Sequence, residues 1–218
     1  LIRGKKGTEV RLTVKKLDGQ IIIIPIIRDI VVLEDAYVHS VIMDDKQTGQ
    51  KIGYILLPSF YLEQEGGKGR SCATDVKTEL LALKDKNVDG IVFDLRSNGG
   101  GSLGDVIEMA GFFIGSGPIV QVRGSGSSRK VYEDPDKKVV YEGPLVVMIS
   151  NMSASASEIF AAALQDYGRA VILGSGFSSF GKGTVQTFIP LQKYTTNKEF
   201  DIGALRLSIQ KFYRINGP

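Results

Sequence analysis

From residue 52 onward, short apolar segments alternate with segments of helical periodicity, and this alternation constrains the fold more than any other feature of the sequence. Buried strands are predicted at 52–57, 90–95, 145–150 and 170–173. Helices are predicted at 73–86, 103–114 and 156–167. A strand, a helix and a second strand in succession form a βαβ crossover, and repeated crossovers build a parallel sheet. We therefore predict an α/β fold with a mostly parallel βαβ core.

Residues 1–34 have a different, β-type pattern. Apolar and polar residues alternate over Thr8–Val14, Asp18-Gly19 is a turn signal, and Ile21–Ile30 is a second apolar segment. Two strands cannot bury a core by themselves, so we predict that this piece is the end of a small β domain. The predicted boundaries are 1–34 for this piece, 35–51 for a linker and 52–218 for the main domain.

The composition excludes several classes of protein. The chain has 27 basic and 24 acidic side chains and a net charge of +3, too small to indicate a nucleic-acid surface without a clustered patch. The longest apolar run, Ile21–Ile27, is too short to cross a membrane. One cysteine, Cys72, excludes an internal disulfide, and one histidine, His39, excludes metal centres with several histidines. A hydrolase of this composition is expected to use a base other than histidine, and no cofactor or metal is predicted.

The first candidate site is the glycine-rich turn Gly99–Gly101, between a predicted strand and a predicted helix. With Gly104 it has the spacing of a dinucleotide fingerprint, but residues 118–125 lack the acidic residue that would bind the ribose. A tight turn before a helix capped by Ser102 explains part of the pattern. Consecutive glycines also let backbone N–H groups approach a ligand closely, as in an oxyanion hole or an anion cradle.

The second candidate is Lys182, in the segment Gly176–Gly183. The segment is similar to a phosphate-binding Walker A loop, which requires Ser or Thr after the lysine and then a helix. Here Gly183 follows the lysine and Thr184–Pro190 is predicted as a strand, so nucleotide binding is disfavoured. Two interpretations remain, an exposed lysine in a glycine turn and a lysine with a chemical role.

The third candidate is the serine-rich turn Asn151–Glu158. Ser155 and Glu158 have the spacing of a capping box, so one interpretation is the start of a helix and nothing more. A turn of small residues between a strand and a helix also exposes a nucleophilic hydroxyl at the edge of an α/β sheet. A serine nucleophile needs a base, and a lysine serves when burial lowers its pKa. Ser155 with Lys182 is therefore a candidate catalytic pair.

Three long stretches occur in one order along the chain, Gly90–Gly101, Ser153–Ala170 and Phe180–Gln186. Taken together they resemble the C-terminal-processing (tail-specific) serine proteases. The opening Ile2–Val14 resembles the end of the PDZ domain that precedes the protease core in this family. The resemblance implies a ClpP/crotonase-like core over 52–218, with a PDZ remnant before it.

The resemblance also implies a catalytic pair with a supporting side chain. Ser155 matches the nucleophile, Lys182 matches the general base, and Gln186 matches the glutamine that orients the lysine. Ser153 and Ser157 are the alternatives for the nucleophile, because an error of two residues at the start of the helix would shift the assignment.

Further roles follow from the same resemblance. The N–H groups of Ala156 and of a glycine in the Gly99–Gly101 loop, Gly100 or Gly101, match the oxyanion hole. Asp166 matches an acidic residue implicated in some members, which we interpret as supporting. The link Gly174–Gly181 is two residues longer than is usual in the family. The extra length is expected to affect the angle at which Lys182 approaches the site.

As a whole, the resemblance implies a serine endopeptidase that hydrolyses unstructured or tail-tagged polypeptides through an acyl-enzyme, without a cofactor. It implies polypeptide partners, no nucleic acid, and a location in the periplasm or cell envelope. The alternative is a non-catalytic domain of the same fold that binds a ligand or a peptide.

Overall fold

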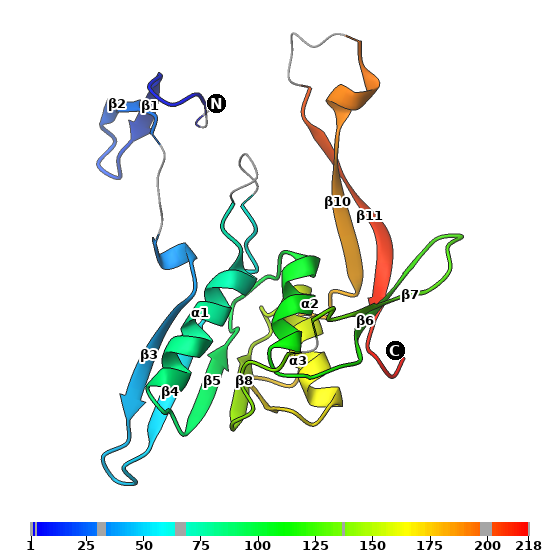
Figure 1. Ribbon diagram of the computed structural model, residues 1–218. Helices are drawn as coiled ribbons and strands as arrows, with labels where there is room; N and C mark the ends of the chain where they lie inside the picture. The colour runs from blue at the N-terminus through cyan, green and yellow to red at the C-terminus, as the bar shows by residue number, and fades with distance from the viewer. Residues whose placement is uncertain are drawn as a thin grey trace. The chain divides into compact units, whose positions relative to one another are not determined.

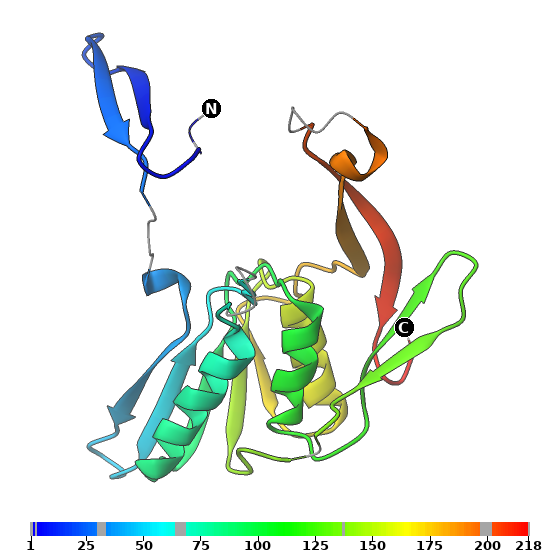
Figure 2. The same ribbon diagram turned by 45° about the horizontal axis from the view of Figure 1, so that its top comes forward.

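The computed structural model describes residues 2, 4–29, 34–63, 69–136, 138–196 and 202–217. They belong to two compact units, Leu1–Glu34 and Asp35–Pro218, and the larger unit contains every candidate site residue. Figures 1 and 2 show the chain from two directions. Among the described residues, none of the helices combines the length and the apolar character that crossing a bilayer requires.

The smaller unit is a β-hairpin. β1 (Glu9–Lys15) pairs antiparallel with β2 (Ile21–Ile27). Gly19 has a φ of +86°, a conformation that glycine adopts readily in a turn. The two predicted strands and the turn between them are therefore confirmed, although Ile30 lies outside the described residues. That this hairpin ends a PDZ domain stays a prediction.

The larger unit is built on a five-stranded sheet in the order β3-β4-β5-β8-β9. Its strands are β3 (His39–Asp44), β4 (Lys51–Leu56), β5 (Gly90–Asp94), β8 (Leu145–Ile149) and β9 (Val171–Gly174). Four of them run parallel and β3 joins antiparallel, so the predicted α/β fold is confirmed. The segment 35–51 is not only a linker as predicted, because it contains β3. As an edge strand that is largely exposed, β3 has little of the burial pattern that marks a strand in a sequence.

Three helices cover one face of this sheet (Figures 1 and 2). They are α1 (Cys72–Asp85), α2 (Leu103–Gly111) and α3 (Ala156–Asp166). The ring centroid of Phe160 on α3 lies 5.2 Å from that of Phe93 on β5 and 5.8 Å from that of Phe113. Burial of such a side chain contributes about 1.5–3 kcal/mol. This aromatic core therefore fixes α3, and with it Ser155 at its N-terminus, against the sheet.

A second, antiparallel sheet has the order β10-β11-β6-β7. Its strands are β6 (Pro118–Gly124), β7 (Lys130–Glu133), β10 (Thr184–Pro190) and β11 (Ala204–Tyr213). Short 3₁₀ turns lie at Glu34–Ala36 and Leu191–Tyr194. Of the four strands, the sequence predicts only β10. β10 and β11 form an arm that extends from the rest of the unit (Figure 1), and β11 is exposed over most of its length, so burial imposes no clear alternation on it.

Candidate active site

Two turns meet at one edge of the parallel sheet. β5 leads into the glycine-rich turn, and β8 leads into the serine-rich turn. Because β5 and β8 are parallel neighbours, both turns follow the carboxyl ends of their strands and lie side by side. In open α/β sheets, ligands bind at this edge. The topology thus brings Gly99–Gly101 next to Ser155.

Asn98 joins the two turns. Its buried side chain donates from Nδ2 to the carbonyl oxygen of Leu57 at 2.8 Å, and its Oδ1 accepts the N–H of Gly100 at 2.8 Å. Its own carbonyl oxygen accepts the N–H of Ala154 at 3.0 Å and the hydroxyl of Ser157 at 2.9 Å. Buried polar groups are costly to leave unpaired, so these bonds hold the turns together. The sequence pattern does not identify Asn98 as a residue of the site, since asparagine is common in turns.

Gly100 packs against the serine-rich turn with no room for a side chain. A Cβ atom on Gly100 would lie 2.6 Å from the carbonyl oxygen of Ala154 and 2.8 Å from Cβ of Ser155, and its φ is +94°. A Cβ atom on Gly101 would lie 2.1 Å from the carbonyl oxygen of Phe60. The glycines do permit a close backbone approach, as the sequence indicates. In this structure the approach is to neighbouring segments of the protein, including the Ser155 turn.

Ser155 has a strained backbone conformation, with φ +58° and ψ −112°. Residues with a side chain rarely adopt positive φ, and such strain costs on the order of 1–3 kcal/mol. Ser155 directly precedes α3, so its hydroxyl stands at the mouth of a helix. A strained residue between a strand and a helix is typical of a nucleophile turn.

The two flanking serines are engaged in structural hydrogen bonds. Ser153 Oγ donates to the carbonyl oxygen of Leu95 at 2.8 Å, and Ser157 Oγ donates to that of Asn98 at 2.9 Å. Both serines are fully buried, whereas Ser155 is half-buried. This geometry favours Ser155 over its two alternatives as a nucleophile.

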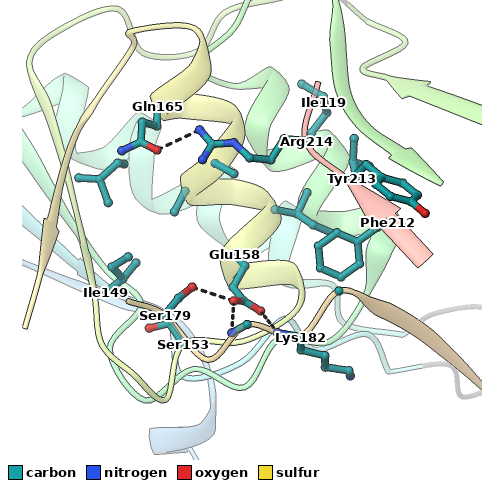
Figure 3. A pocket seen from close by; sticks show the side chains of 17 residues that line it. Ile119, Ile149, Ser153, Glu158, Gln165, Ser179, Lys182, Phe212, Tyr213 and Arg214 are labelled. Carbon is teal, nitrogen blue, oxygen red and sulfur yellow. Dashed lines mark hydrogen bonds between the residues drawn. The ribbon is translucent and has the colours of Figure 1, made fainter. Parts of the chain in front are cut away.

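Glu158 connects the serine-rich turn to the loop that carries the lysine (Figure 3). Its Oε2 accepts the N–H of Ser155 at 2.7 Å and the N–H of Lys182 at 3.0 Å. Its Oε1 accepts the hydroxyl of Ser179 at 2.7 Å and the N–H of Gly181 at 2.6 Å. Glu158 therefore caps the start of α3, as the capping-box interpretation predicts, and also binds the 179–182 loop. One carboxylate with four donors positions the whole 179–182 loop on the first turn of α3.

Lys182 lines the same cleft as Ser155. The cleft has a volume of about 390 Å³, and the predicted site residues that line it are Ser155, Ala156, Gly100, Gly101, Lys182 and Gln186. The lysine is half-buried, and Figure 3 shows its side chain leading away from the Glu158 carboxylate. No hydrogen bond joins Lys182 Nζ to Ser155 Oγ in the described part of the chain. Lys182 is followed by β10 and not by a helix, which argues against a Walker A loop.

The predicted oxyanion donors differ in whether their N–H groups already have an acceptor. The N–H of Gly100 already donates to Asn98 Oδ1 at 2.8 Å. The N–H groups of Ala156 and Gly101 donate to no acceptor among the described residues. Ala156 is also the first residue of α3, where the helix dipole favours negative charge. An oxyanion in the cleft would therefore find its free donors at Ala156 and Gly101.

Gln186 lines the cleft but forms no hydrogen bond with Lys182, both residues being among those the structure describes. Its Nε2 donates to Ser208 Oγ on β11 at 3.3 Å, and the side chain is exposed. The predicted orienting contact between Gln186 and Lys182 is not made in this structure.

Asp166 lies at the other end of α3. With a rise of 1.5 Å per residue, the helix places it about 16 Å from Ser155. Its Oδ2 accepts Nε of Arg214 at 3.1 Å, and Arg214 also donates to Gln165 Oε1 at 3.0 Å. This ion pair ties the segment after β11 to α3 (Figure 3 shows the Arg214–Gln165 bond). That Asp166 supports the catalytic residues stays a prediction.

A buried carboxylate directly precedes the segment that forms the glycine-rich turn. Asp94, at the end of β5, accepts the Tyr54 hydroxyl at 2.6 Å and Nη2 of Arg96 at 2.7 Å. Burial by itself would raise the pKa of Asp94, but the hydrogen bonds from Arg96 and Tyr54 outweigh it and lower that pKa. Asp94 is therefore ionised and anchors the start of the turn.

A second pocket of about 360 Å³ adjoins the cleft (Figure 3). Ile159, Lys182 and Phe212 line both cavities. The segment that carries Lys182 thus has open space beside it, and Glu158 is the main side chain that holds it to the protein body.

Comparison with known proteins agrees with this arrangement. Residues 51–218 match the profile of peptidase family S41. The chain belongs to peptidase family S41. The tail-specific protease of Haemophilus influenzae is 42% identical over 217 residues, which are 99% of this chain and 30% of that protein. The carboxy-terminal processing protease CtpA of Bacillus subtilis is 32% identical over 219 residues, 100% of this chain and 41% of that protein. The resemblance to C-terminal-processing proteases is thereby confirmed.

The S41 fold is also found in a solved structure. The photosystem II D1 C-terminal processing protease superposes with a TM-score of 0.66 and 22% identity, over 99% of this chain and 53% of that one. At this identity the likeness concerns the fold alone. This chain spans less than half the length of each of the two curated relatives above.

Proposed function

We propose that this chain contains the catalytic centre of a serine endopeptidase, with Ser155 as the nucleophile and Lys182 as the general base. The observation that carries the proposal is that a strained serine at a helix mouth and a lysine from a distant loop line one cleft, joined through Glu158. Membership of a peptidase family supports the reaction class.

The proposed reaction proceeds in two stages. The neutral amine of Lys182 takes the proton of Ser155 Oγ, which attacks the carbonyl carbon of the scissile peptide bond. When the C–N bond breaks, the lysine returns the proton to the leaving amine, and an ester to Ser155 remains. Water then attacks the ester with Lys182 as base, the C–Oγ bond breaks, and Ser155 regains its proton. The overall change is the hydrolysis of one peptide bond, with no cofactor consumed.

The tetrahedral intermediates need donors for their negative oxygen. We assign this role to the N–H groups of Ala156 and Gly101, which have no other acceptor among the described residues. Gly100 would contribute only if its N–H left Asn98. Gln186 would orient the lysine after a change of rotamer. The side chain of Lys182 must also turn toward Ser155, a change that its flexible stem permits.

As substrates we propose unstructured or tail-tagged polypeptides, by analogy with the names of the S41 relatives. An extended peptide is the form in which a scissile bond reaches a cleft of this size. A location in the periplasm or cell envelope is part of the same analogy.

A serine-directed fluorophosphonate probe tests the assignment. We expect one label per chain, and peptide mapping should place it on Ser155. Ser155→Ala should abolish labelling and the cleavage of an unfolded polypeptide. Lys182→Arg should abolish both as well, since a guanidinium keeps its positive charge and cannot act as a base. Labelling of Ser153 or Ser157, or full activity in Lys182→Arg, would refute the assignment.

The second candidate function is a binding domain without catalysis. The missing hydrogen bond between Ser155 Oγ and Lys182 Nζ favours it. In that case a peptide would protect the chain against thermal unfolding, yet neither cleavage nor labelling would occur.

A further inference from the structure

A groove of about 400 Å³ lies on the second sheet, apart from the cleft. Thr184 and Lys211 line the groove, whereas their chain neighbours Val185 and Phe212 line the cleft. Successive residues of a strand point to opposite faces of a sheet. The side chains of Thr184 and Lys211 therefore point away from the face on which Val185 and Phe212 line the cleft, and the proposed reaction uses neither of them.

Two cations stand side by side in this groove. The strand register places Lys211 of β11 directly opposite Arg123 of β6, and opposite Thr184 of β10 on its other side. Directly opposed residues on antiparallel strands have their Cβ atoms about 4.5–5.5 Å apart, and like charges at that spacing repel each other. Both charged side chains are exposed. The sheet thus holds two positive charges in a place where a bound anion would relieve their repulsion.

No carboxylate balances these charges in the described part of the molecule. The residues that line the groove include no aspartate or glutamate. Within the described ranges, neither Arg123 nor Lys211 forms an ion pair. The remaining lining includes the hydroxyl side chains of Ser125 and Thr184, which can donate hydrogen bonds to an anion.

We propose that this groove binds an acidic segment of a polypeptide, whose Asp or Glu carboxylates pair with Arg123 and Lys211. A guanidinium binds a carboxylate through two parallel hydrogen bonds, and an ammonium beside it can bind the next oxygen. Among the described residues that line the groove, Tyr213 is the one aromatic side chain. A single ring does not provide the series of stacking platforms on which single-stranded nucleic acid binds, so the groove fits a peptide better.

This inference does not depend on the proposed function, because binding in the groove needs neither Ser155 nor Lys182. Its test uses the full chain with Ser155→Ala, so that no peptide is cleaved. Fluorescence anisotropy is measured with labelled hexaglutamate, hexaglutamine and hexalysine peptides at low and at high ionic strength. We expect hexaglutamate to bind more tightly than the other two, with an affinity that falls as salt rises.

The decisive variant is Arg123→Gln with Lys211→Gln, which should weaken hexaglutamate binding about tenfold or more. Lys130→Gln is the matched control. It removes one charge from the same sheet, but Lys130 pairs with Val122, the neighbour of Arg123, and so points to the other face. The control should bind hexaglutamate within about twofold of the parent.

A measurement of folding accompanies the binding data. Removal of two repelling charges should leave Tm at low salt unchanged or raised. If the double variant is unfolded, the single variants Arg123→Gln and Lys211→Gln are compared in its place, and each should weaken binding severalfold. Equal binding of hexaglutamate and hexaglutamine, or unchanged affinity in folded variants, would overturn the proposal. If a single-stranded oligonucleotide of equal charge binds more tightly than hexaglutamate, the ligand of the groove is a nucleic acid and not a polypeptide.

Discussion

Ser155 and Lys182 share one hydrogen-bond acceptor, Oε2 of Glu158. This atom accepts the Ser155 N–H at 2.7 Å and the Lys182 N–H at 3.0 Å, so the two backbone nitrogens are at most 2.7 plus 3.0, or 5.7 Å, apart. The longer link before Lys182 therefore does not carry the lysine away from the serine. For the proposed pair to form, the side chain of Lys182 must also turn toward Ser155.

Replacement of Glu158 should separate the two residues. Glu158→Gln keeps one acceptor oxygen but turns an NH₂ group toward N–H and O–H donors, so about half of the four hydrogen bonds are lost. We expect a loss of stability of about 1–3 kcal/mol. If Lys182 is the base, as proposed, we also expect kcat to fall about a hundredfold, because the lysine is displaced. Urea unfolding and kcat on an unfolded polypeptide measure the two effects.

The control for this variant is Glu142→Gln, an exposed glutamate outside the cleft, which should change neither quantity. A Glu158→Gln chain as stable as the parent would contradict the role of Glu158 whether or not the chain is an active protease.

The glycines of the glycine-rich turn should differ in their tolerance of a methyl group. Gly100→Ala forces a Cβ atom to 2.6 Å from the carbonyl oxygen of Ala154 at a φ of +94°. We expect a loss of about 2–5 kcal/mol, from backbone strain together with overpacking. In Gly99→Ala the added Cβ atom has no neighbour within 4 Å, so stability should change by less than about 0.5 kcal/mol. Equal unfolding midpoints for the two variants would contradict the close packing of the turns.

Asn98 should be intolerant of an isosteric carboxylate. Asn98→Asp exchanges the Nδ2 donor for an oxygen that faces the carbonyl oxygen of Leu57, which leaves a buried acceptor without a donor. We expect a loss of about 2–4 kcal/mol by urea unfolding. The matched change Asn151→Asp, at an exposed position of the neighbouring turn, should be nearly neutral. A similar loss in both variants would mean that added charge, and not the lost donor, is responsible.

Asp94 should make the stability depend on pH in the acid range. Its pKa is lower in the folded chain than in the unfolded chain, because the bonds from Arg96 and Tyr54 outweigh burial. The ionised carboxylate therefore stabilises the fold above about pH 4, and this contribution is lost as pH falls through the folded pKa. Arg96→Gln should cost about 1–3 kcal/mol at neutral pH, and the difference from the parent should shrink on acidification.

Urea unfolding from neutral to acid pH measures this difference. Arg129→Gln, at an exposed position in the β6–β7 turn, controls for the loss of one positive charge. A difference that grows as pH falls would show that Asp94 is not stabilised by Arg96.

The sequence by itself determined the βαβ core and the residue types of the candidate site. α1 and α3 begin and end within about one residue of their predicted bounds, because their apolar stripes are packed against one sheet face and periodic burial imposes a periodic sequence. Ser155 and Lys182 could be selected because each lies in a short stretch whose chemistry is local. β3, β7 and β11 were beyond such reasoning, since an exposed edge or arm leaves little alternation in the sequence. β6 lacks alternation for the opposite reason, because four successive residues, Ile119–Val122, are buried.

Only the tertiary structure decided how these residues are joined. Glu158 accepts from Lys182, 24 positions away, and Asn98 accepts from Ser157, 59 positions away. A hydrogen bond between such distant residues leaves no periodic trace, because it depends on where the sheet places two loops and not on which residues are neighbours in the chain. For the same reason the requirement for glycine at position 100 and the opposition of Arg123 and Lys211 become visible only when the strands are paired.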